Sequence, residues 1–343
     1  MFTPTTGRFT RTKTGTLAVA LAAALLCVAQ GGEARAKSKK DKTPPRGVPV
    51  LWRDPGAVSA RDTFTGPASG VTRASLRRVT VIKTEEGGYS PKFRVRDAAG
   101  RTWVAKVGKE AQSETAAVRL LWAVGYATEI NYLLPCAHLR GAAKLPKDTE
   151  RCEGDGFTNV RFEARPAGVK RAGEWKWDKN PFTGTREFQG LKTLMVLINN
   201  WDVKDSNNVL LQTRRGGRSE LDYVISDLGA TFGKTGGLPV FWRITRSRND
   251  PEGFSHDRFV EGVRDDGRVN FEFQGKKSGM FDDVRVEDAR WIGSLLAQLS
   301  DLQLYNVFRA ANYTPEERHV LVSAVRGRIN QLVNLPRARS AGR

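Results

Sequence analysis

The sequence predicts an α+β protein, in which a strand-rich first half precedes a mainly helical second half. Short β-rich runs separated by turn residues fill residues 76–165, whereas residues 166–335 contain several apolar stripes at helical spacing. The composition, 39% hydrophobic and 27% charged residues, is that of an ordinary globular protein that buries a core. Wholesale disorder of the chain is therefore excluded.

Five strands and one helix are predicted in the first half. The predicted strands are residues 79–84, 92–96, 102–107, 130–139 and 157–164. Gly-containing turns separate the first three, so we expect them to form an antiparallel meander. Residues 110–124 carry apolar side chains at helical spacing and end at Gly125, which indicates a helix between the third and fourth strands.

The second half predicts a buried helix, a hairpin and a group of C-terminal helices. The helix is centred on residues 191–198, and the hairpin joins residues 209–212 to 221–225 around a Gly-Gly turn. The predicted C-terminal helices are residues 286–299, 302–311 and 314–335. Thr314 and Glu317 have the spacing of a capping box, which marks the start of the last helix.

Residues 1–36 are predicted to be a secretory signal peptide rather than part of the fold. Basic residues precede an apolar run at 17–29, which is too short for a membrane span, and Ala34-Arg35-Ala36 has the form of a cleavage site. We expect the chain to be exported to the periplasm or the extracellular space. An uncleaved N-terminal anchor is the alternative.

Two further segments are predicted to lie outside the folded body. Residues 37–75 are rich in Lys, Pro, Gly and Ser without sustained periodicity, which indicates a basic linker or an irregular extension. Residues 336–343 form a basic tail.

The cysteines predict one intrachain disulfide. Cys27 lies in the apolar run of the signal, so Cys136 and Cys152 are the pair that remains after processing. An exported protein occupies an oxidising compartment, which favours a Cys136–Cys152 bridge. A pair of free buried thiols is the alternative.

The net charge predicts anionic partners. The chain has 56 Lys and Arg against 37 Asp and Glu, a net charge of +19. Such a surface attracts phosphates, anionic glycans, lipid headgroups or an anionic envelope polymer. No helix-turn-helix, zinc-finger or RNA-binding signature is present, so specific nucleic-acid recognition is not expected. The 3 His and 3 Cys do not have the spacing of a structural zinc or haem site.

Two short motifs carry residues suited to phosphoryl transfer. Residues 202–207 read Asp202-x-Lys204-x-x-Asn207, and the predicted hairpin ends at Asp227-Leu228-Gly229. Phosphoryl transfer needs a carboxylate for the attacking hydroxyl, a cation near the phosphate and oxygen ligands for a metal. The two motifs supply all of these groups, although the same residues also commonly cap and turn a chain after a helix.

These motifs resemble the protein-kinase-like superfamily. The first has the spacing of the kinase catalytic loop, and the second is similar to the metal-binding Asp-Phe-Gly with Leu in place of Phe. Val104-Ala105-Lys106 resembles the third-strand lysine motif of that family. The resemblance implies a bilobal fold, with an N-lobe of an antiparallel sheet plus one helix at 76–165 and a mainly helical C-lobe at 166–335.

The resemblance also implies a nucleotide site in the N-lobe. Lys106 would hold the α- and β-phosphates of ATP or another nucleotide, and Glu114 would orient it, with Glu110 as the rival partner. Val104 lies on the same strand face as Lys106, where it would cover the adenine. Gly87-Gly88 would present backbone N–H groups to phosphate.

The remaining implied roles belong to the C-lobe. Asp202 would position the acceptor hydroxyl, and Lys204 would face the γ-phosphate. Asn207 and Asp227 would ligate Mg²⁺ or Mn²⁺.

The chain departs from the family pattern in ways that mark it as atypical. It lacks the Gly-x-Gly-x-x-Gly loop, and no Ala-Pro-Glu follows Asp227. The helix at residues 113–120, followed by Gly125-Tyr126, is more similar to the corresponding helix of the HipA and phosphatidylinositol-kinase branches. The predicted signal peptide is a feature that the chain shares with the secreted Fam20-type and spore-coat CotH-type kinases, which it resembles in this respect.

Three functions stay open from the sequence. The first is an exported ATP-dependent phosphotransferase that acts on a protein, glycan or lipid acceptor. The second is a pseudokinase that serves as a binding module, and the third is a basic envelope-binding protein without catalysis. Kinase folds also perform adenylylation and glutamylation, so the motifs do not fix the transferred group.

Overall fold

A computed structural model describes residues 45–68, 74–85, 89–142, 149–236 and 246–336. This part of the chain is a mixed α+β structure with six α-helices, and it contains every strand and helix that the sequence predicts. The predicted signal peptide, Gly87, Gly88 and most of the predicted basic tail lie outside the described residues.

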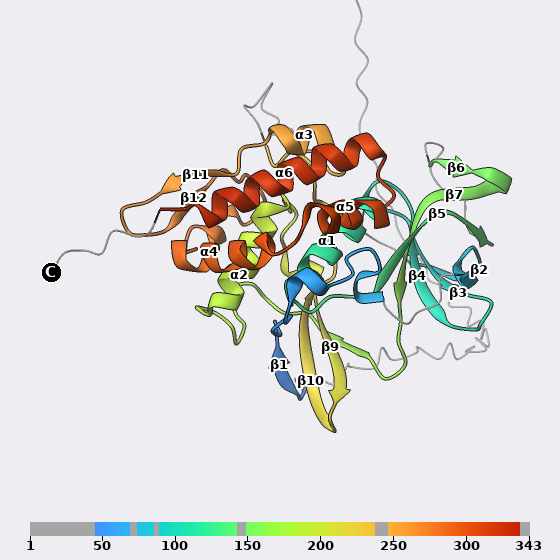
Figure 1. Ribbon diagram of the computed structural model, residues 1–343. Helices are drawn as coiled ribbons and strands as arrows, with labels where there is room; N and C mark the ends of the chain where they lie inside the picture. The colour runs from blue at the N-terminus through green and yellow to red at the C-terminus, as the bar shows by residue number, and fades with distance from the viewer. Residues whose placement is uncertain (1–44, 69–73, 86–88, 143–148, 237–245, 337–343) are drawn as a thin grey trace, which may run out of the picture. The chain divides into compact units, whose positions relative to one another are not determined.

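The elements follow one another from β1 to α6 (Figure 1). The strands are β1 (Val48–Val50), β2 (Arg78–Glu85), β3 (Lys92–Arg96), β4 (Thr102–Lys106), β5 (Asn131–Arg140), β6 (Arg151–Cys152), β7 (Gly156–Ala164), β8 (Lys170–Gly173), β9 (Asn208–Arg215), β10 (Arg218–Ile225), β11 (Val260–Val263) and β12 (Val269–Phe271). The helices are α1 (Glu110–Ala123), α2 (Arg186–Leu197), α3 (Pro251–His256), α4 (Val286–Ala297), α5 (Asp301–Ala310) and α6 (Pro315–Val333).

Six strands of the first half form one sheet, in the order β4-β3-β2-β5-β7-β6. The predicted meander is present, because β2, β3 and β4 pair antiparallel. The pairing of β2 with β5 is parallel, so the sheet is not wholly antiparallel as predicted. An additional pairing of β4 with β7 closes the sheet on itself and places Lys106 opposite Arg161.

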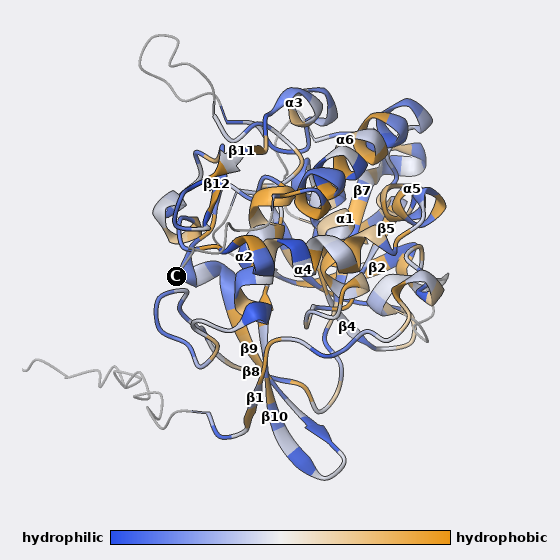
Figure 2. Cartoon of the chain, turned by 60° about the vertical axis from the view of Figure 1, so that its left-hand side comes forward, coloured by the Kyte–Doolittle hydropathy of each residue, from blue (hydrophilic) through white to orange (hydrophobic). Residues whose placement is uncertain are grey.

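A second sheet has the order β1-β10-β9-β8. Its centre is the predicted hairpin, and hydrophilic residues cover the tip of that hairpin (Figure 2). Strand β1 joins the sheet in parallel with β10, and Leu51 and Val58 just after it are buried. Residues 45–68, which the sequence assigns to the linker or extension, therefore contribute to the core.

Two hydrophobic clusters hold the described residues together. One lies inside the first sheet and includes Phe93, Trp103 and Phe162. The larger one joins α1, α2, α4, α5 and α6, which carry apolar residues on their packed faces (Figure 2). The capping box predicted for the last helix is present, since Thr314 accepts a hydrogen bond from the Glu317 N–H and Glu317 accepts one from the Thr314 N–H.

The two predicted disulfide cysteines lie together at the edge of the first sheet. The sulfur atoms of Cys136 on β5 and Cys152 on β6 are at bonding distance, and their Cα atoms are 5.8 Å apart. This Cα separation is typical of a disulfide.

None of the helices in the described ranges combines the length and apolar character needed to cross a bilayer.

Candidate active site

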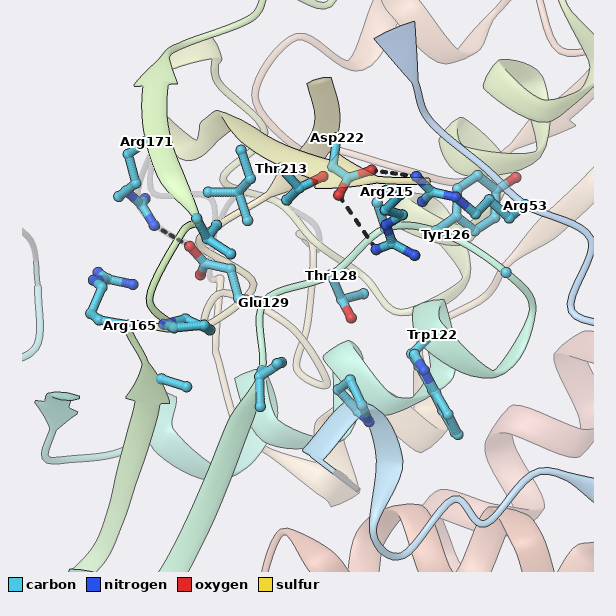
Figure 3. A pocket seen from close by; sticks show the side chains of 18 of the residues that line it. Arg53, Trp122, Tyr126, Thr128, Glu129, Arg165, Arg171, Thr213, Arg215 and Asp222 are labelled. Atoms are coloured by element: carbon cyan, nitrogen blue, oxygen red, sulfur yellow. Dashed lines mark hydrogen bonds and ion pairs between the residues drawn. The ribbon is translucent and has the colours of Figure 1, made fainter. Parts of the chain in front are cut away.

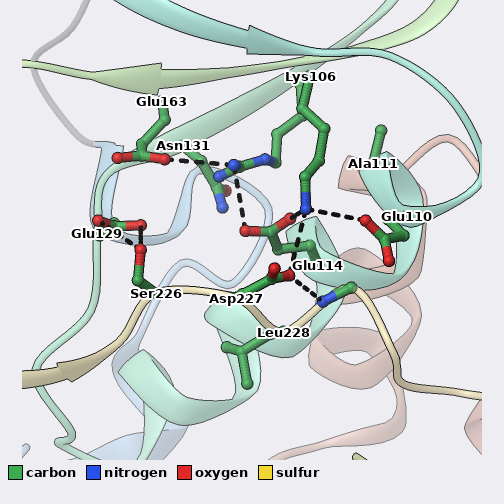
Figure 4. Close-up of polar contacts among 12 residues, drawn as sticks. Lys106, Glu110, Ala111, Glu114, Glu129, Asn131, Glu163, Ser226, Asp227 and Leu228 are labelled. Carbon is green, nitrogen blue, oxygen red and sulfur yellow. Dashed lines mark hydrogen bonds and ion pairs between the residues drawn. The ribbon is translucent and has the colours of Figure 1, made fainter. Parts of the chain in front are cut away.

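Lys106 is the centre of a buried cluster of charged side chains (Figure 4). It is the last residue of β4, and its Nζ lies 2.7 Å from Glu114 Oε2 and 3.2 Å from Glu110 Oε2, both on α1. The same Nζ lies 3.3 Å from Asp227 Oδ1. The strand, the helix and the loop after β10 thus bring together three residues that the sequence assigns to the site, and the rival Glu110 joins them.

The electrostatics of the cluster keep Lys106 charged. Burial alone would lower its pKa, but the neighbouring carboxylates, first Glu114 and then Asp227, raise the pKa above the usual value for lysine. Lys106 is therefore a buried ammonium that stays charged at neutral pH.

Arg161 is a second cation in this cluster, which the sequence reading missed. It lies on β7 directly opposite Lys106, and its Nη2 is 3.1 Å from Glu114 Oε1 and 3.2 Å from Glu163 Oε2. Its Nε and Nη1 are buried and have no hydrogen-bond partner among the described residues. The signal in the sequence is a pair of charged residues, Arg161 and Glu163, within a strand whose neighbours are apolar.

Asp227 follows β10 and is oriented by its neighbours. Its Oδ1 accepts hydrogen bonds from Lys106 Nζ and from the Gly229 N–H, 3.3 Å away in each case, and Lys92 Nζ lies 4.0 Å from Oδ2. Burial raises the pKa of this carboxyl, but Lys106 and Lys92 outweigh that effect and hold the pKa below its usual range. Asp227 is therefore ionised at neutral pH.

Gly229 allows the loop after β10 to lie directly against α1. A Cβ atom at this position would be 2.6 Å from the Cβ of Glu110, which is closer than two such atoms approach in proteins. Ser113 on α1 donates a hydrogen bond to the Gly229 carbonyl over 2.8 Å. The sequence Asp227-Leu228-Gly229 thus anchors the loop on α1, with Leu228 fully buried beneath it.

The loop of residues 202–207 is tied to Asp227 through Asn207. The backbone N–H groups of Ser226 and Asp227 both donate to the Asn207 carbonyl, over 2.7 Å and 3.3 Å. The side-chain amide of Asn207 donates to the Asp202 carbonyl over 2.8 Å, which leaves its Oδ1 available as a ligand atom. The predicted metal ligands Asn207 and Asp227 are therefore held next to each other.

Asp202 has two lysine neighbours, of which the sequence reading named one. Lys204 Nζ donates to Asp202 Oδ2 over 2.9 Å, and Lys276 forms a short contact with Oδ1. Partial burial of Asp202 raises its pKa, but the hydrogen bonds from Lys276 and Lys204 outweigh burial and lower the pKa overall. Lys276 follows β12, far along the chain, and no local pattern connects it to Asp202.

A cavity of about 650 Å³ adjoins these groups. Five of the predicted site residues line it: Val104, Glu114, Lys204, Asn207 and Asp227. Arg161 and Lys92 line it as well. Lys106 and Asp202 are not lining residues, but each contacts a residue that is.

The donor atoms at this cavity suit a hard cation. Asp227 offers a carboxylate and Asn207 an amide oxygen, and Mg²⁺ prefers oxygen ligands. No group of three or more His, Cys, Asp or Glu residues that could hold a metal is found in the described ranges. A cation held by Asp227 and Asn207 would therefore take its remaining ligands from water and from a bound phosphate, as Mg²⁺ commonly does.

Comparison with known proteins gives a likeness in structure but none in sequence. No family model matches the sequence, and no curated protein matches it. Among solved structures, the chain is similar to the crystal structure of a Helicobacter pylori proinflammatory kinase, CtkA. The two share 9% sequence identity with a TM-score of 0.45, over 78% of this chain and 97% of that one.

Proposed function

We propose that this chain is an atypical ATP-dependent phosphotransferase with a bilobal, kinase-like fold. Residues 76–165 would form the N-lobe and residues 166–335 the C-lobe. The observation that carries the proposal is that Lys106, Glu114 and Asp227 meet in one buried cluster beside a cavity that Asn207 also lines. These residues come from separate regions of the sequence, and each matches a role in phosphoryl transfer.

The cavity suits a nucleotide in size and charge. Its volume of about 650 Å³ lies within the range of small-molecule sites. Arg161 Nε and Nη1, which have no hydrogen-bond partner among the described residues, supply donors for phosphate oxygens. The ammonium of Lys106, in contact with the lining residues Glu114 and Asp227, adds positive charge beside the cavity. Val104 provides an apolar wall for the base.

A divalent cation, Mg²⁺ or Mn²⁺, would neutralise negative charge on the phosphates when bound. Asp227 and Asn207 are the residues that would hold it. Asp227 suits this role because its pKa is depressed, so no proton competes for its oxygens at neutral pH.

In the transfer step, Asp202 would position an acceptor hydroxyl and accept its proton. The acceptor oxygen forms a bond to the γ-phosphorus while the bond from that phosphorus to the β-γ bridging oxygen breaks, which releases ADP. Lys204, hydrogen-bonded to Asp202, would stabilise the charge on the transferred group. We further propose that the chain is exported and that its acceptor is a protein, glycan or lipid hydroxyl.

The test is binding of ATP with Mn²⁺ or Mg²⁺, measured by calorimetry on the wild type and on Asp227→Ala. We expect saturable, metal-dependent binding that Asp227→Ala abolishes and that the exposed matched control Asp265→Ala leaves unchanged. Transfer of the γ-phosphate is then followed with labelled ATP, first into water and then into candidate acceptors. Absence of nucleotide binding by the wild type would refute the proposal.

A second candidate is a nucleotide-binding module without catalysis. The specific observation in its favour is that Lys204 and Lys276 already occupy both carboxylate oxygens of Asp202. An acceptor hydroxyl would have to displace one of them. Metal-dependent nucleotide binding without release or transfer of phosphate would favour this function.

A further inference from the structure

The structure contains a second cavity, of about 430 Å³ (Figure 3). Its walls come from the end of α1, the segment leading into β5, the connection after β7, strand β9 and residues 53–67. Arg165 and Arg171 line both cavities, so they separate the two. None of the residues to which we assign phosphoryl transfer lines this second cavity.

Most of the charges around the second cavity are paired with one another. Asp222 lies 2.9 Å from Arg53 and 3.8 Å from Arg215, and Glu129 pairs with Arg171 (Figure 3). Arg61 differs. Burial lowers its pKa, and among the described residues no carboxylate opposes that effect.

Arg61 is nevertheless held firmly in place. Its guanidinium lies over the ring of Trp122, 4.0 Å from the ring centroid, and Nη1 donates to the Pro55 carbonyl over 3.2 Å. Its own carbonyl accepts a hydrogen bond from Gln303 over 2.9 Å. A cation that is oriented before binding loses little entropy when an anion arrives.

Three polar atoms around this cavity are buried without a partner. They are Nε of Arg61 and the hydroxyl oxygens of Thr128 and Thr213, and none has a hydrogen bond within the described residues. Buried polar groups in native proteins are normally satisfied, so these three atoms need a partner outside the described residues, which is either a water molecule or a ligand. A hydroxyl turns about its C–O bond and can donate to an oxygen of that partner.

Apolar side chains also line this cavity. Trp122, Ile130 and Leu211 offer ring and aliphatic surface, and the volume lies within the range of small-molecule sites. The Arg61 guanidinium, which has no carboxylate partner among the described residues, therefore lines the same cavity as this apolar surface. This combination matches a ligand with one anionic head and a short apolar body.

We propose that the second cavity binds a small amphipathic anion, with its carboxylate or phosphate head at Arg61, Thr128 and Thr213 and its apolar part against Trp122, Ile130 and Leu211. The half-buried guanidinium of Arg61 supplies affinity for the head group, because no carboxylate among the described residues already pairs with it. This site is separate from the proposed nucleotide site and does not depend on it.

The test is calorimetry of the full chain with octyl phosphate and octanoate, each below its micelle concentration. Inorganic phosphate lacks the apolar body, and octyl glucoside lacks the charge, so both serve as comparison ligands. We expect saturable binding of at least one amphipathic anion, with both comparison ligands at least tenfold weaker, and the ratio of the two dissociation constants identifies the preferred head group.

Three variants separate this site from other surfaces. Arg61→Met should weaken binding at least about tenfold, the effect of losing hydrogen bonds to a charged group. Arg61→Lys keeps the charge and should bind more tightly than Arg61→Met. Arg140→Met, which removes an exposed arginine outside the cavity, and Asp227→Ala should bind like the wild type.

Equal binding by Arg61→Met and the wild type would overturn the proposal, as would equal affinity for octyl glucoside and the anions. Should Arg61→Met fail to fold, Thr213→Phe provides a second route, since its ring would fill part of the cavity. Unchanged affinity for the anions in Thr213→Phe would also refute the site.

Discussion

Lys106 Nζ lies 2.7 Å from Glu114 Oε2, and each side chain is only 1% exposed. Two charges buried this deeply depend on each other, because neither is solvated by water. Glu114 also pairs with Arg161, and Lys106 with Glu110 and Asp227, so the pair is part of a network. Removing one member leaves the others with uncompensated charge.

Replacing Lys106 with Met should therefore lower the free energy of unfolding by about 3–5 kcal/mol, the cost of breaking a buried ion pair. The double variant Lys106→Met with Glu114→Gln should lose less than the sum of the two single losses, because it removes both charges. Urea denaturation measures all three values. The exposed control Lys83→Met should stay within about 0.5 kcal/mol of the wild type. Additive losses in the double variant would contradict the buried pairing.

Ionisation of Asp227 should make the free energy of unfolding depend on pH in the acidic range. Its folded-state pKa lies below the unfolded value of about 3.9, so its stabilising effect is complete above that value and is lost as the pH falls through the folded-state pKa. At pH 7 the variant Asp227→Asn should be less stable than the wild type by about 1.5–3 kcal/mol, the range for hydrogen bonds to a charged group.

The difference between wild type and Asp227→Asn should shrink as the pH is lowered from about 4, since the carboxyl then takes up a proton in the unfolded wild type before it does so in the folded protein. Urea denaturation of both proteins at a series of pH values measures this difference. If the difference in free energy of unfolding between the two proteins stays constant or increases at acidic pH, Lys106 does not stabilise the ionised carboxylate.

Elements with a clear pattern in their own residues were predictable from the sequence, and strands without one were not. Short β-rich runs between turn residues predict β3 and β4, and the helical stripe predicts α1, because in these segments the local pattern decides the structure. Strand β8 has the sequence Lys-Arg-Ala-Gly and little intrinsic strand preference. It is extended because β9 pairs with it, and the residues of β8 alone do not reveal that partner.

The same distinction applies to the candidate site. Motif spacing identified Lys106, Glu114, Asn207 and Asp227, all of which lie in or beside the buried cluster. Arg161 was missed because its position opposite Lys106 depends on the closure of the sheet between β4 and β7. Lys276 was missed because it reaches Asp202 from 74 residues along the chain.

The link between Cys136 and Cys152 should contribute measurably to stability. It spans a sequence separation of 16 residues, and closing a loop of about this size is worth roughly 3 kcal/mol through the entropy of the unfolded chain. Reductant should lower the wild-type free energy of unfolding by that amount. The variant with both cysteines replaced by Ser should have this lower free energy of unfolding both with and without reductant. Equal stability of the wild type with and without reductant would rule out the bridge.

Gly229 should not tolerate a side chain. Gly229→Ala places a methyl group against the Cβ, Cγ and Cδ of Glu110, so α1 and the loop after β10 must separate. We expect a loss of about 1–3 kcal/mol in the free energy of unfolding, the usual cost of overpacking. Gly327→Ala on α6 is the matched control, because nothing lies within 4 Å of the added Cβ. That change should stabilise the helix by up to about 1 kcal/mol, so equal effects of the two substitutions would exclude a close contact at Gly229.

Lys276 should control the ionisation of Asp202. Its hydrogen bond lowers the pKa of that carboxyl, so Lys276→Met should raise the pKa of Asp202 towards its ordinary value. The matched control is Lys277→Met, because Lys277 is the neighbouring lysine but pairs with Asp205 instead. Carbon-13 NMR titration of the aspartate carboxyl groups, with Asp202→Asn to assign the signal, measures the shift directly. A pKa that is unchanged in Lys276→Met, or raised equally in Lys277→Met, would mean that the contact between Lys276 and Asp202 does not persist in solution.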